Sequence, residues 1–154
     1  MEKTNVMRLL DVADILYEAY EYNPETTDGM LVAKALNEDP NEVFKTLVTV
    51  APSKNHYVFV IPVNCSLNLK KAAKSVGEKS IEMIKQKELL PLTGYIHGGC
   101  SPIGMKKPFT TVINEPAQLF DAICVSAGKV GKQIKIYPFI LAEYVSAKFY
   151  DLTD

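Results

Sequence analysis

The sequence predicts an α+β protein in which short strands form a mixed, barrel-like core with helices packed around it. Segments rich in β-branched and aromatic residues are interleaved with short amphipathic segments in an irregular order. A doubly wound parallel sheet would need a regular alternation of strand and helix, which this chain lacks. A length of 154 residues, with 47% hydrophobic and 23% charged residues, suffices for a buried core. We therefore expect residues 1–154 to form one domain.

An amphipathic helix is expected near the start of the chain. Thr4 can cap its first turn, and Met7, Leu10 and Ala13 follow at a spacing of three. Later helical segments are bounded by glycine or proline, which commonly mark helix ends. These segments are Gly29–Asn37, Asn68–Val76, Lys85–Leu92, a helical turn at Glu115–Phe120, and Phe139–Ala147, and Asp39–Asn41 is expected to form a turn.

The clearest strand signal is a hairpin formed by Val43–Val50 and Tyr57–Val63, both rich in β-branched and aromatic residues. Shorter segments with the same character, or with residues that alternate in polarity, are also expected to be strands. These are Leu16–Tyr22, Ile81–Met83, Thr110–Asn114, Ala122–Ala127 and Gln133–Tyr137.

The segment Gly94–Gly104 is the most distinctive stretch of the chain. It holds four of the eight glycines, and Pro102 excludes a helix at its centre. Such a loop exposes backbone amides that can bind a carbonyl, hydroxyl or phosphate oxygen. Alternatively, its glycines only permit tight packing in a structural crossover, which is the commoner use of glycine-rich loops.

The net charge of −1 conceals an uneven distribution along the chain. Residues 1–65 carry five basic and ten acidic residues, a net charge of −5, whereas residues 66–135 carry eleven lysines and five acids, a net charge of +6. A basic segment of this kind can bind a polyanion. Because aromatic residues are not interleaved with the lysines, an ordinary solvated surface explains it as well.

The cysteines do not indicate a disulfide framework or a zinc site. Cys65, Cys100 and Cys124 are odd in number and widely spaced, and only two histidines could supplement them as ligands. We expect neither a metal nor a cofactor. No apolar run approaches the ~20 residues of a membrane span, and the first residues lack the apolar core of a signal peptide. A cytoplasmic location without a membrane partner is therefore expected.

Lys45 is the most conspicuous charged residue of a predicted strand. Its neighbours on the same strand face, Val43 and Leu47, are apolar, so its ammonium must reach an edge, pair with an acid or enter a cavity. Within a cavity it would suit an anion or a developing oxyanion. A nucleophilic pair of Cys100 with His97 is disfavoured, because an isolated cysteine is more often an inert apolar residue. Ser101 lacks the Gly-x-Ser-x-Gly context, and no phosphate-binding or dinucleotide fingerprint is present.

Several short motifs together resemble a known family. They are Phe44-Lys45-Thr46-Leu47, Leu69–Lys74, Thr93-Gly94-Tyr95, Gly98–Gly104, Lys106-Lys107 and Val125–Lys129. In this order they resemble the YbaK/EbsC family of aminoacyl-tRNA deacylases, relatives of the editing domain of bacterial prolyl-tRNA synthetases. The resemblance extends from about Thr4 to Leu141 and implies the mixed, barrel-like fold expected above.

The resemblance implies a trans-editing enzyme that removes cysteine from mischarged Cys-tRNA(Pro), and from Cys-tRNA(Cys) as well. Cysteine and proline are close in size, so a binding pocket discriminates between them by only a few kcal/mol and a second site must correct errors. In the mechanism proposed for the YbaK branch, the substrate's own thiol attacks the ester and a thiolactone is released. The protein then supplies positioning and electrostatics.

The same resemblance implies the roles of individual residues. Lys45 and Gly99 are expected in the catalytic site. Substrate binding is expected at Tyr20, Thr46, Gly98, Ser101, Pro102 and Ser126. The net charge of +6 over residues 66–135 leads us to expect tRNA binding at Lys70, Lys71, Lys74, Lys106 and Lys107. The expected partners are the acceptor end of an aminoacyl-tRNA and a prolyl-tRNA synthetase, with no DNA.

Two departures from the family pattern leave alternatives open. Asp28 precedes Gly29 where relatives often place an aromatic residue, and Gln133 stands where some relatives carry an acid. Both lie near the expected pocket, so the amino-acid specificity is open. The alternatives are hydrolysis of another ester such as Ala-tRNA(Pro) by water, and a non-catalytic module that binds tRNA or a synthetase.

Overall fold

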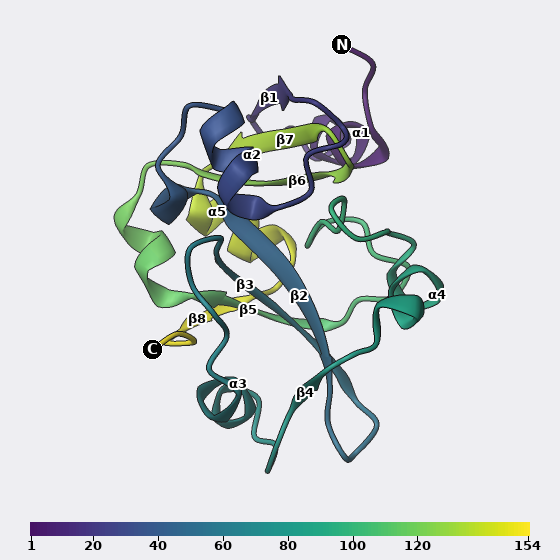
Figure 1. Cartoon of the computed structure of the whole chain (residues 1–154), viewed down its shortest axis with the longest axis vertical. Coiled ribbons are helices and arrows are strands. Elements are labelled where there is room, and N and C mark those ends of the chain that lie inside the picture. The colour runs from purple at the N-terminus through teal and green to yellow at the C-terminus, as the bar shows by residue number, and fades with distance from the viewer.

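The computed structural model describes all residues from 1 to 154. Its helices and 3₁₀ turns lie between short strands, in the irregular order that the sequence indicates (Figure 1). The α-helices are α1 (Asn5–Val12), α2 (Gly29–Ala35), α3 (Leu69–Ser75), α4 (Leu89–Thr93) and α5 (Pro138–Tyr144), and the 3₁₀ turns are η1 (Pro40–Glu42), η2 (Gln86–Glu88) and η3 (Glu115–Leu119). None of the helices is long and apolar enough to cross a membrane.

The strands form two sheets. Their bounds are β1 (Glu18–Glu21), β2 (Phe44–Val50), β3 (His56–Pro62), β4 (Glu82–Met83), β5 (Thr110–Asn114), β6 (Ile123–Lys129), β7 (Lys132–Ile136) and β8 (Lys148–Tyr150). A five-stranded mixed sheet has the order β4-β2-β3-β5-β8, with β5 parallel to both β3 and β8. A three-stranded antiparallel sheet has the order β1-β7-β6.

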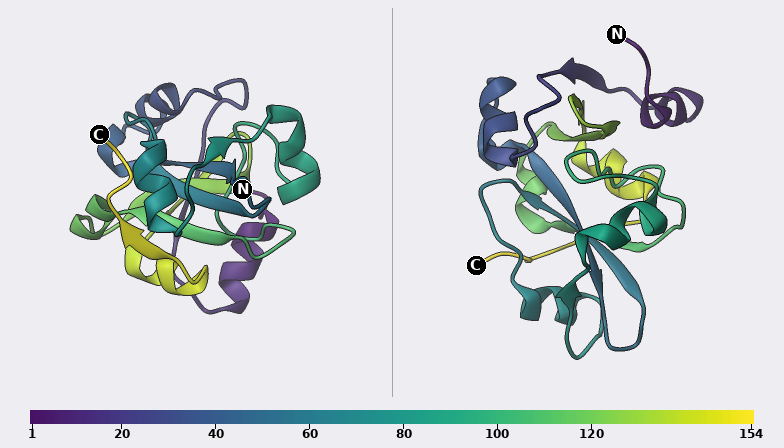
Figure 2. Two further views of the ribbon diagram at one scale, coloured as in Figure 1. Left: turned by 90° about the horizontal axis from the view of Figure 1, so that it is seen from below. Right: turned by 45° about the vertical axis from the view of Figure 1, so that its right-hand side comes forward.

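The predicted α+β class is confirmed, and the barrel-like character has a specific origin. Val43, just before β2, forms a parallel bridge with Cys124 on β6, so the two sheets meet at that point. They remain two open sheets and do not close into a ring. The predicted hairpin is β2–β3, and it runs along the long axis of the molecule, with its turn at the end opposite the β1-β7-β6 sheet (Figures 1 and 2).

The main core lies where the two sheets face α1 and α5. In α1, Thr4 Oγ1 accepts a hydrogen bond from Met7 N at 3.2 Å and thereby caps the helix as predicted. Val6, Met7 and Leu10 then point into the core beside residues of β6 and β7. A second cluster packs Ala72 and Ala73 of α3 against the other face of the five-stranded sheet.

Two of the helix predictions differ from the structure. The helix predicted at Phe139–Ala147 ends at Tyr144, because Ser146 takes a left-handed conformation (φ 56°) and redirects the chain into β8, a strand that the sequence did not indicate. The helix predicted at Lys85–Leu92 is divided into η2 and α4. Gly94 then ends α4 with φ 85°, a conformation that glycine adopts at little cost.

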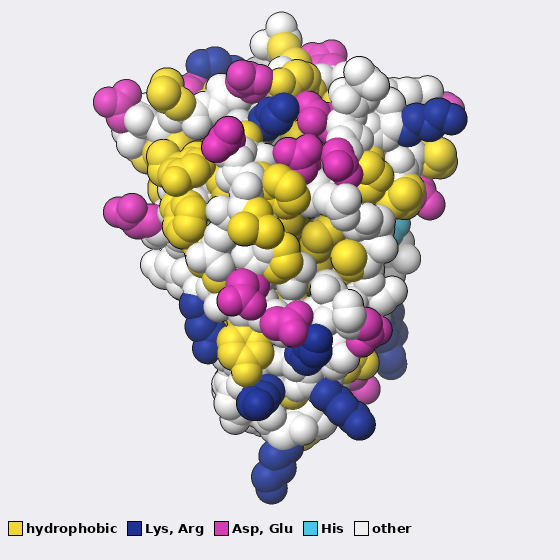
Figure 3. Space-filling view, turned by 90° about the vertical axis from the view of Figure 1, so that its left-hand side faces the viewer, with side chains coloured by type: hydrophobic (Ala, Val, Ile, Leu, Met, Phe, Trp, Pro, Cys, Tyr) yellow, Lys and Arg dark blue, Asp and Glu magenta, His cyan; other side chains and the backbone are white.

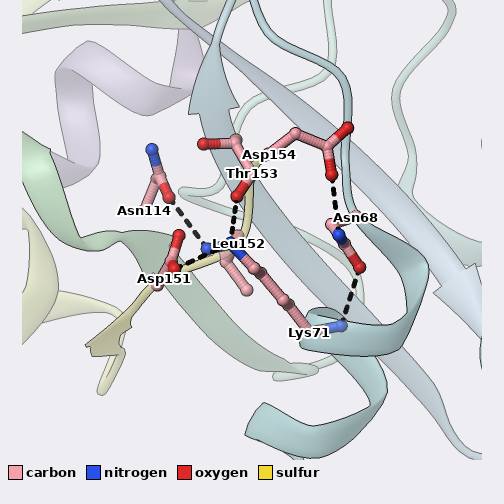
Figure 4. Close-up of polar contacts among 7 residues, drawn as sticks. All are labelled: Asn68, Lys71, Asn114, Asp151, Leu152, Thr153 and Asp154. Atoms are coloured by element: carbon pink, nitrogen blue, oxygen red, sulfur yellow. Dashed lines mark hydrogen bonds and ion pairs between the residues drawn. The ribbon is translucent and has the colours of Figure 1, made fainter.

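The C-terminus is held by a group of side chains that we call the C-terminal clamp: Asn68, Lys71, Asn114 and residues 151–154 (Figure 4). Leu152 N donates to the buried Asn114 Oδ1 at 3.0 Å. From α3, Lys71 Nζ lies 2.8 Å from the Asp151 carboxylate, and Asn68 donates to Asp154. The asparagine, lysine and aspartate side chains of this cluster are therefore all paired.

Candidate active site

A cavity of about 610 Å³ opens beside the first half of β2. There β2 is an uncovered edge, because the short strand β4 pairs only with Thr49 and Val50. The other walls are formed by the start of α2, the residue after β3, the first residue of α4, the loop before Cys100, and one residue each of β6 and β7. The polar lining residues are Tyr22, Thr27, Asp28, Lys45, Thr46, His97, Cys100, Ser126 and Gln133. Its volume lies within the ordinary range of ligand sites, roughly 300–1,000 Å³.

Two consecutive glycines allow the loop to approach its neighbours closely. Gly98 has φ 87°, and a Cβ atom there would lie 2.9 Å from Thr27 Cγ2. At Gly99 a Cβ atom would lie 2.9 Å from Val130 N, in the β6–β7 turn, where backbone cannot easily give way. The segment is thus packed on both sides, which holds the wall of the cavity in place.

Lys45 contributes a positive charge to the cavity. Its side chain is half-buried, and none of the three ion pairs in the protein includes it. Since no hydrogen bond engages its ammonium either, the group is available to a ligand. A lysine ammonium offers three N–H donors and no acceptor.

Three further polar groups in the cavity have no partner. Tyr22 Oη, Thr46 Oγ1 and Gln133 Oε1 are buried without a hydrogen bond, and no other buried side-chain nitrogen or oxygen of the chain is in that state. Unpaired buried polar atoms are rare, and each one destabilises the folded state by about 1–3 kcal/mol. All three line the same cavity.

Cys100 also lines the cavity, but its thiol is not activated. Burial raises the pKa of Cys100 to about 12, so the sulfur is protonated at neutral pH. His97, three residues earlier, is exposed. No cluster of three His, Cys, Asp or Glu side chains that could hold a metal ion is found anywhere in the chain.

Residues 24–143 match the aminoacyl-tRNA editing domain family. The chain belongs to this family. An editing domain removes an amino acid from a tRNA, so the expected class of enzyme, an aminoacyl-tRNA deacylase, and the family resemblance are both confirmed.

Two relatives in sequence differ greatly in length. The chain is 44% identical over 154 residues to "Putative Cys-tRNA(Pro)/Cys-tRNA(Cys) deacylase EbsC" of Enterococcus faecalis, with 99% of this chain and 94% of that protein aligned. It is 31% identical over 83 residues to "Proline--tRNA ligase" of Shouchella clausii, where the match covers 54% of this chain and 14% of that longer protein.

Solved structures support the fold. A "putative trans-editing enzyme for prolyl tRNA synthetase" superposes with a TM-score of 0.85 at 21% identity, over 100% of this chain and 99% of the other. A protein described as hypothetical superposes with a TM-score of 0.90 at 20% identity, over 98% and 100% of the two chains. At these identities the likeness establishes the editing-domain fold alone.

Four residues expected in the site line the cavity of this editing domain: Lys45, Thr46, Gly98 and Ser126. Ser126 Oγ accepts a hydrogen bond from Gly128 N at 3.1 Å, so its position is fixed by the β6–β7 turn.

The other four expected site residues lie outside the cavity lining. The Tyr20 hydroxyl donates to the Glu18 carboxylate. Gly99 packs against the β6–β7 turn as described above. Ser101 is buried, and its hydroxyl accepts from Ile103 N. Pro102 borders a separate hollow of about 410 Å³ near α5. Their roles in substrate binding and catalysis stay predictions.

The lysines expected to bind tRNA fall into two groups. Lys70 and Lys74 are exposed on α3, at the end of the molecule away from α2, whereas Lys71 on the same helix belongs to the C-terminal clamp (Figure 1). Lys106 and Lys107 are exposed beside the glycine-rich loop. On one face of the molecule, lysine side chains concentrate at the lower end of the view, away from α2, and carboxylates predominate above them (Figure 3). This distribution agrees with the uneven charge along the chain.

The sequence interpretation missed Tyr22 and did not assign a role to Gln133. Tyr22 follows β1, and its backbone N–H donates to Gly131 O at 2.9 Å, which anchors it beside the β6–β7 turn. Gln133 pairs with Tyr20 across the β1–β7 ladder and is only 6% exposed. The available signal for Gln133 was its place next to Ile134 in a short predicted strand that follows the Gly131 turn.

Proposed function

We propose that this editing domain acts in trans to remove cysteine from Cys-tRNA(Pro), and from Cys-tRNA(Cys). The observation that carries the proposal is the unpaired ammonium of Lys45 in a cavity whose lining includes three residues with an unpaired buried oxygen. The 44% identity to the EbsC protein along nearly its whole length supports the same substrates. The proposed partners are the acceptor end of the tRNA and a prolyl-tRNA synthetase.

The reaction proposed is an intramolecular transfer within the substrate. The sulfur of the cysteinyl group forms a bond to its own carbonyl carbon, and the ester C–O bond breaks. The 3′ oxygen of the tRNA receives the proton that the thiol loses, and cysteine thiolactone is released. Because both reacting groups belong to the substrate, the protein accelerates the step by orienting them and stabilising charge.

Lys45 has the properties that this reaction requires. Its ammonium can donate to the ester and ribose oxygens and stabilise the negative charge that builds on the departing 3′ oxygen. Cys100, the one thiol in the cavity lining, is neutral at physiological pH because its pKa lies near 12. It is therefore poorly suited to act as a competing nucleophile.

The proposal is tested by deacylation of a panel of purified aminoacyl-tRNAs with analysis of the released product. The panel contains Cys-tRNA(Pro), Cys-tRNA(Cys), Ala-tRNA(Pro) and Pro-tRNA(Pro). We expect rapid loss of cysteine from the first two, with thiolactone as the first product. Free cysteine without thiolactone would replace the intramolecular step by hydrolysis, and a preference for Ala-tRNA(Pro) would overturn the proposed specificity. A well-folded protein inactive on every substrate would contradict catalysis itself.

A further inference from the structure

The unpaired oxygens of the cavity describe the group that binds there. An orphaned acceptor is satisfied only by a donor, and Gln133 Oε1 can only accept. The hydroxyls of Tyr22 and Thr46 can accept as well as donate. Lys45, in contrast, can only donate. Among the unpaired groups, Lys45 is thus a cationic donor, and the three oxygens are neutral acceptors, although the Gln133 carboxamide also carries the donor Nε2. The cationic donor and the neutral acceptors suit different portions of an aminoacyl ester.

We infer that Tyr22, Thr46 and Gln133 recognise the α-ammonium group of the aminoacyl ester through their neutral oxygens. This inference rests on the proposed function, since it names the part of that substrate which each side of the cavity binds. A primary ammonium carries three N–H donors, as many as there are unpaired oxygens. The ester and ribose oxygens, which are acceptors, are left to Lys45.

Tyr22 is the residue that this inference adds to the site. Tyr20 and Tyr22 are two positions apart, but their hydroxyls have different surroundings. The Tyr20 hydroxyl is already engaged by Glu18 outside the cavity lining. The Tyr22 hydroxyl is buried and unpaired, and Tyr22 is one of the residues that line the cavity. Tyr22 therefore meets the requirement for a substrate-binding tyrosine, whereas Tyr20 lies outside the cavity lining.

Asp28 is the competing acceptor for an ammonium group. It is the one carboxylate of the cavity lining. However, the side chain is exposed to solvent, and its Oδ1 accepts a hydrogen bond from Met30 N at 2.8 Å, which caps α2. Water and the helix end thus already satisfy this carboxylate. The buried oxygen of Gln133 has neither partner, so it gains more from a bound donor.

One consequence concerns stability. An unpaired buried polar atom destabilises the protein without ligand, whereas an apolar group of the same shape does not. The substitutions Tyr22→Phe, Thr46→Val and Gln133→Met should therefore keep or raise Tm while they weaken substrate binding. A residue with a purely structural role would lower Tm when its hydrogen-bonding group is removed.

The experiment measures binding of two unreactive probes. One is adenosine carrying a cysteinyl group in 3′-amide linkage, and the other is its counterpart with a hydroxyl in place of the α-amine. We expect the wild-type protein to bind the amine about ten- to a hundredfold more tightly, as hydrogen bonds to a charged group imply. Each of the three isosteric variants should reduce this preference. The control variant Tyr57→Phe should keep it, because the Tyr57 hydroxyl contacts Glu78 outside the cavity.

The outcomes separate this inference from the proposed function. If the amine probe binds and the preference survives in all three variants, the assignment of the ammonium is wrong, although the deacylase proposal stands. If Asp28→Asn alone abolishes the preference, Asp28 is the acceptor and the inference is also overturned. Asparagine caps helices as well as aspartate does, so that variant should fold. If neither probe binds a folded protein, the inference and the proposed function both fail.

Discussion

The cavity and the C-terminal clamp use similar polar side chains in opposite ways. In the clamp, Asn114 and Lys71 are paired with the last residues of the chain, and their hydrogen bonds hold α3, β5 and the C-terminus together (Figure 4). In the cavity, Lys45 and Gln133 have no partner within the protein. A lysine or a carboxamide can thus either stabilise the fold, as in the clamp, or remain available to a ligand, as in the cavity. Substitutions in the two regions should have separable effects.

The largest effect is expected at Lys45. Lys45→Ala should fold normally, because no internal contact of the ammonium is lost, but single-turnover deacylation of Cys-tRNA(Pro) should fall about 10²–10³-fold. Lys45→Arg should restore little, since a planar guanidinium does not replace a compact charge. Thermal unfolding of both variants provides the control. A well-folded Lys45→Ala protein with a rate near that of wild type would remove Lys45 from the catalytic role.

Substitution in the clamp should have the opposite result. Asn114→Ala removes the acceptor for Leu152 N, both of them buried, and should lower the free energy of unfolding by about 1–3 kcal/mol. The rate per folded molecule should be unchanged, because Asn114 does not line the cavity. Chemical denaturation and single-turnover kinetics measure the two quantities. Unchanged stability would show that the clamp does not hold the C-terminus.

A smaller effect is expected for the lysines proposed to bind the tRNA acceptor arm. Each phosphate contact contributes roughly one unit to the slope of log affinity against log salt concentration. Lys70→Met and Lys107→Met, at exposed positions, should each reduce that slope by about one unit. Lys71→Met should reduce it less, because Asp151 already engages that ammonium. Binding isotherms at several salt concentrations test this, and a wild-type affinity independent of salt would contradict the whole set.

The smallest effect is expected at Cys100. Its thiol is protonated at neutral pH, and in the proposed reaction the substrate supplies its own nucleophile, so Cys100→Ala should change the rate by less than about tenfold, or 1.4 kcal/mol. Mass spectrometry of the protein during turnover is the complementary measurement. A covalent acyl group on Cys100, together with a loss of several orders of magnitude in rate, would establish a cysteine hydrolase in place of the proposed mechanism.

Much of the fold could be predicted from the chain because local signals agree with it. The cap at Thr4, the hairpin of β2 and β3, and the α+β class all follow from residue type and periodicity. The strand β8 could not be predicted, since it depends on pairing with β5, far away in sequence. The two-sheet arrangement likewise depends on the contact of Val43 with Cys124.

The candidate site was predictable in part, because some of its residues also stand out by local signals. Lys45 stands out as a charge among apolar neighbours, and Gly98 belongs to a distinctive loop. Tyr22, which we propose as a substrate-binding residue, could not be distinguished from Tyr20 by sequence, because the two lie two residues apart and only the fold places Tyr22 in the cavity lining. Which lysines of α3 are free could not be predicted either, since Asp151 pairs with Lys71 across 80 residues of sequence.

We propose that the unpaired groups of the cavity, unlike the paired groups of the clamp, receive the aminoacyl end of tRNA. NMR titration of the isotopically labelled protein with the 3′-amide-linked cysteinyl-adenosine tests it most directly. We expect the resonances of Tyr22, Lys45, Thr46 and Gln133 to shift with a single dissociation constant, while those of Asn114 and Leu152 do not move. Shifts confined to the hollow beside Pro102 and Lys107, with an unaffected cavity, would contradict it.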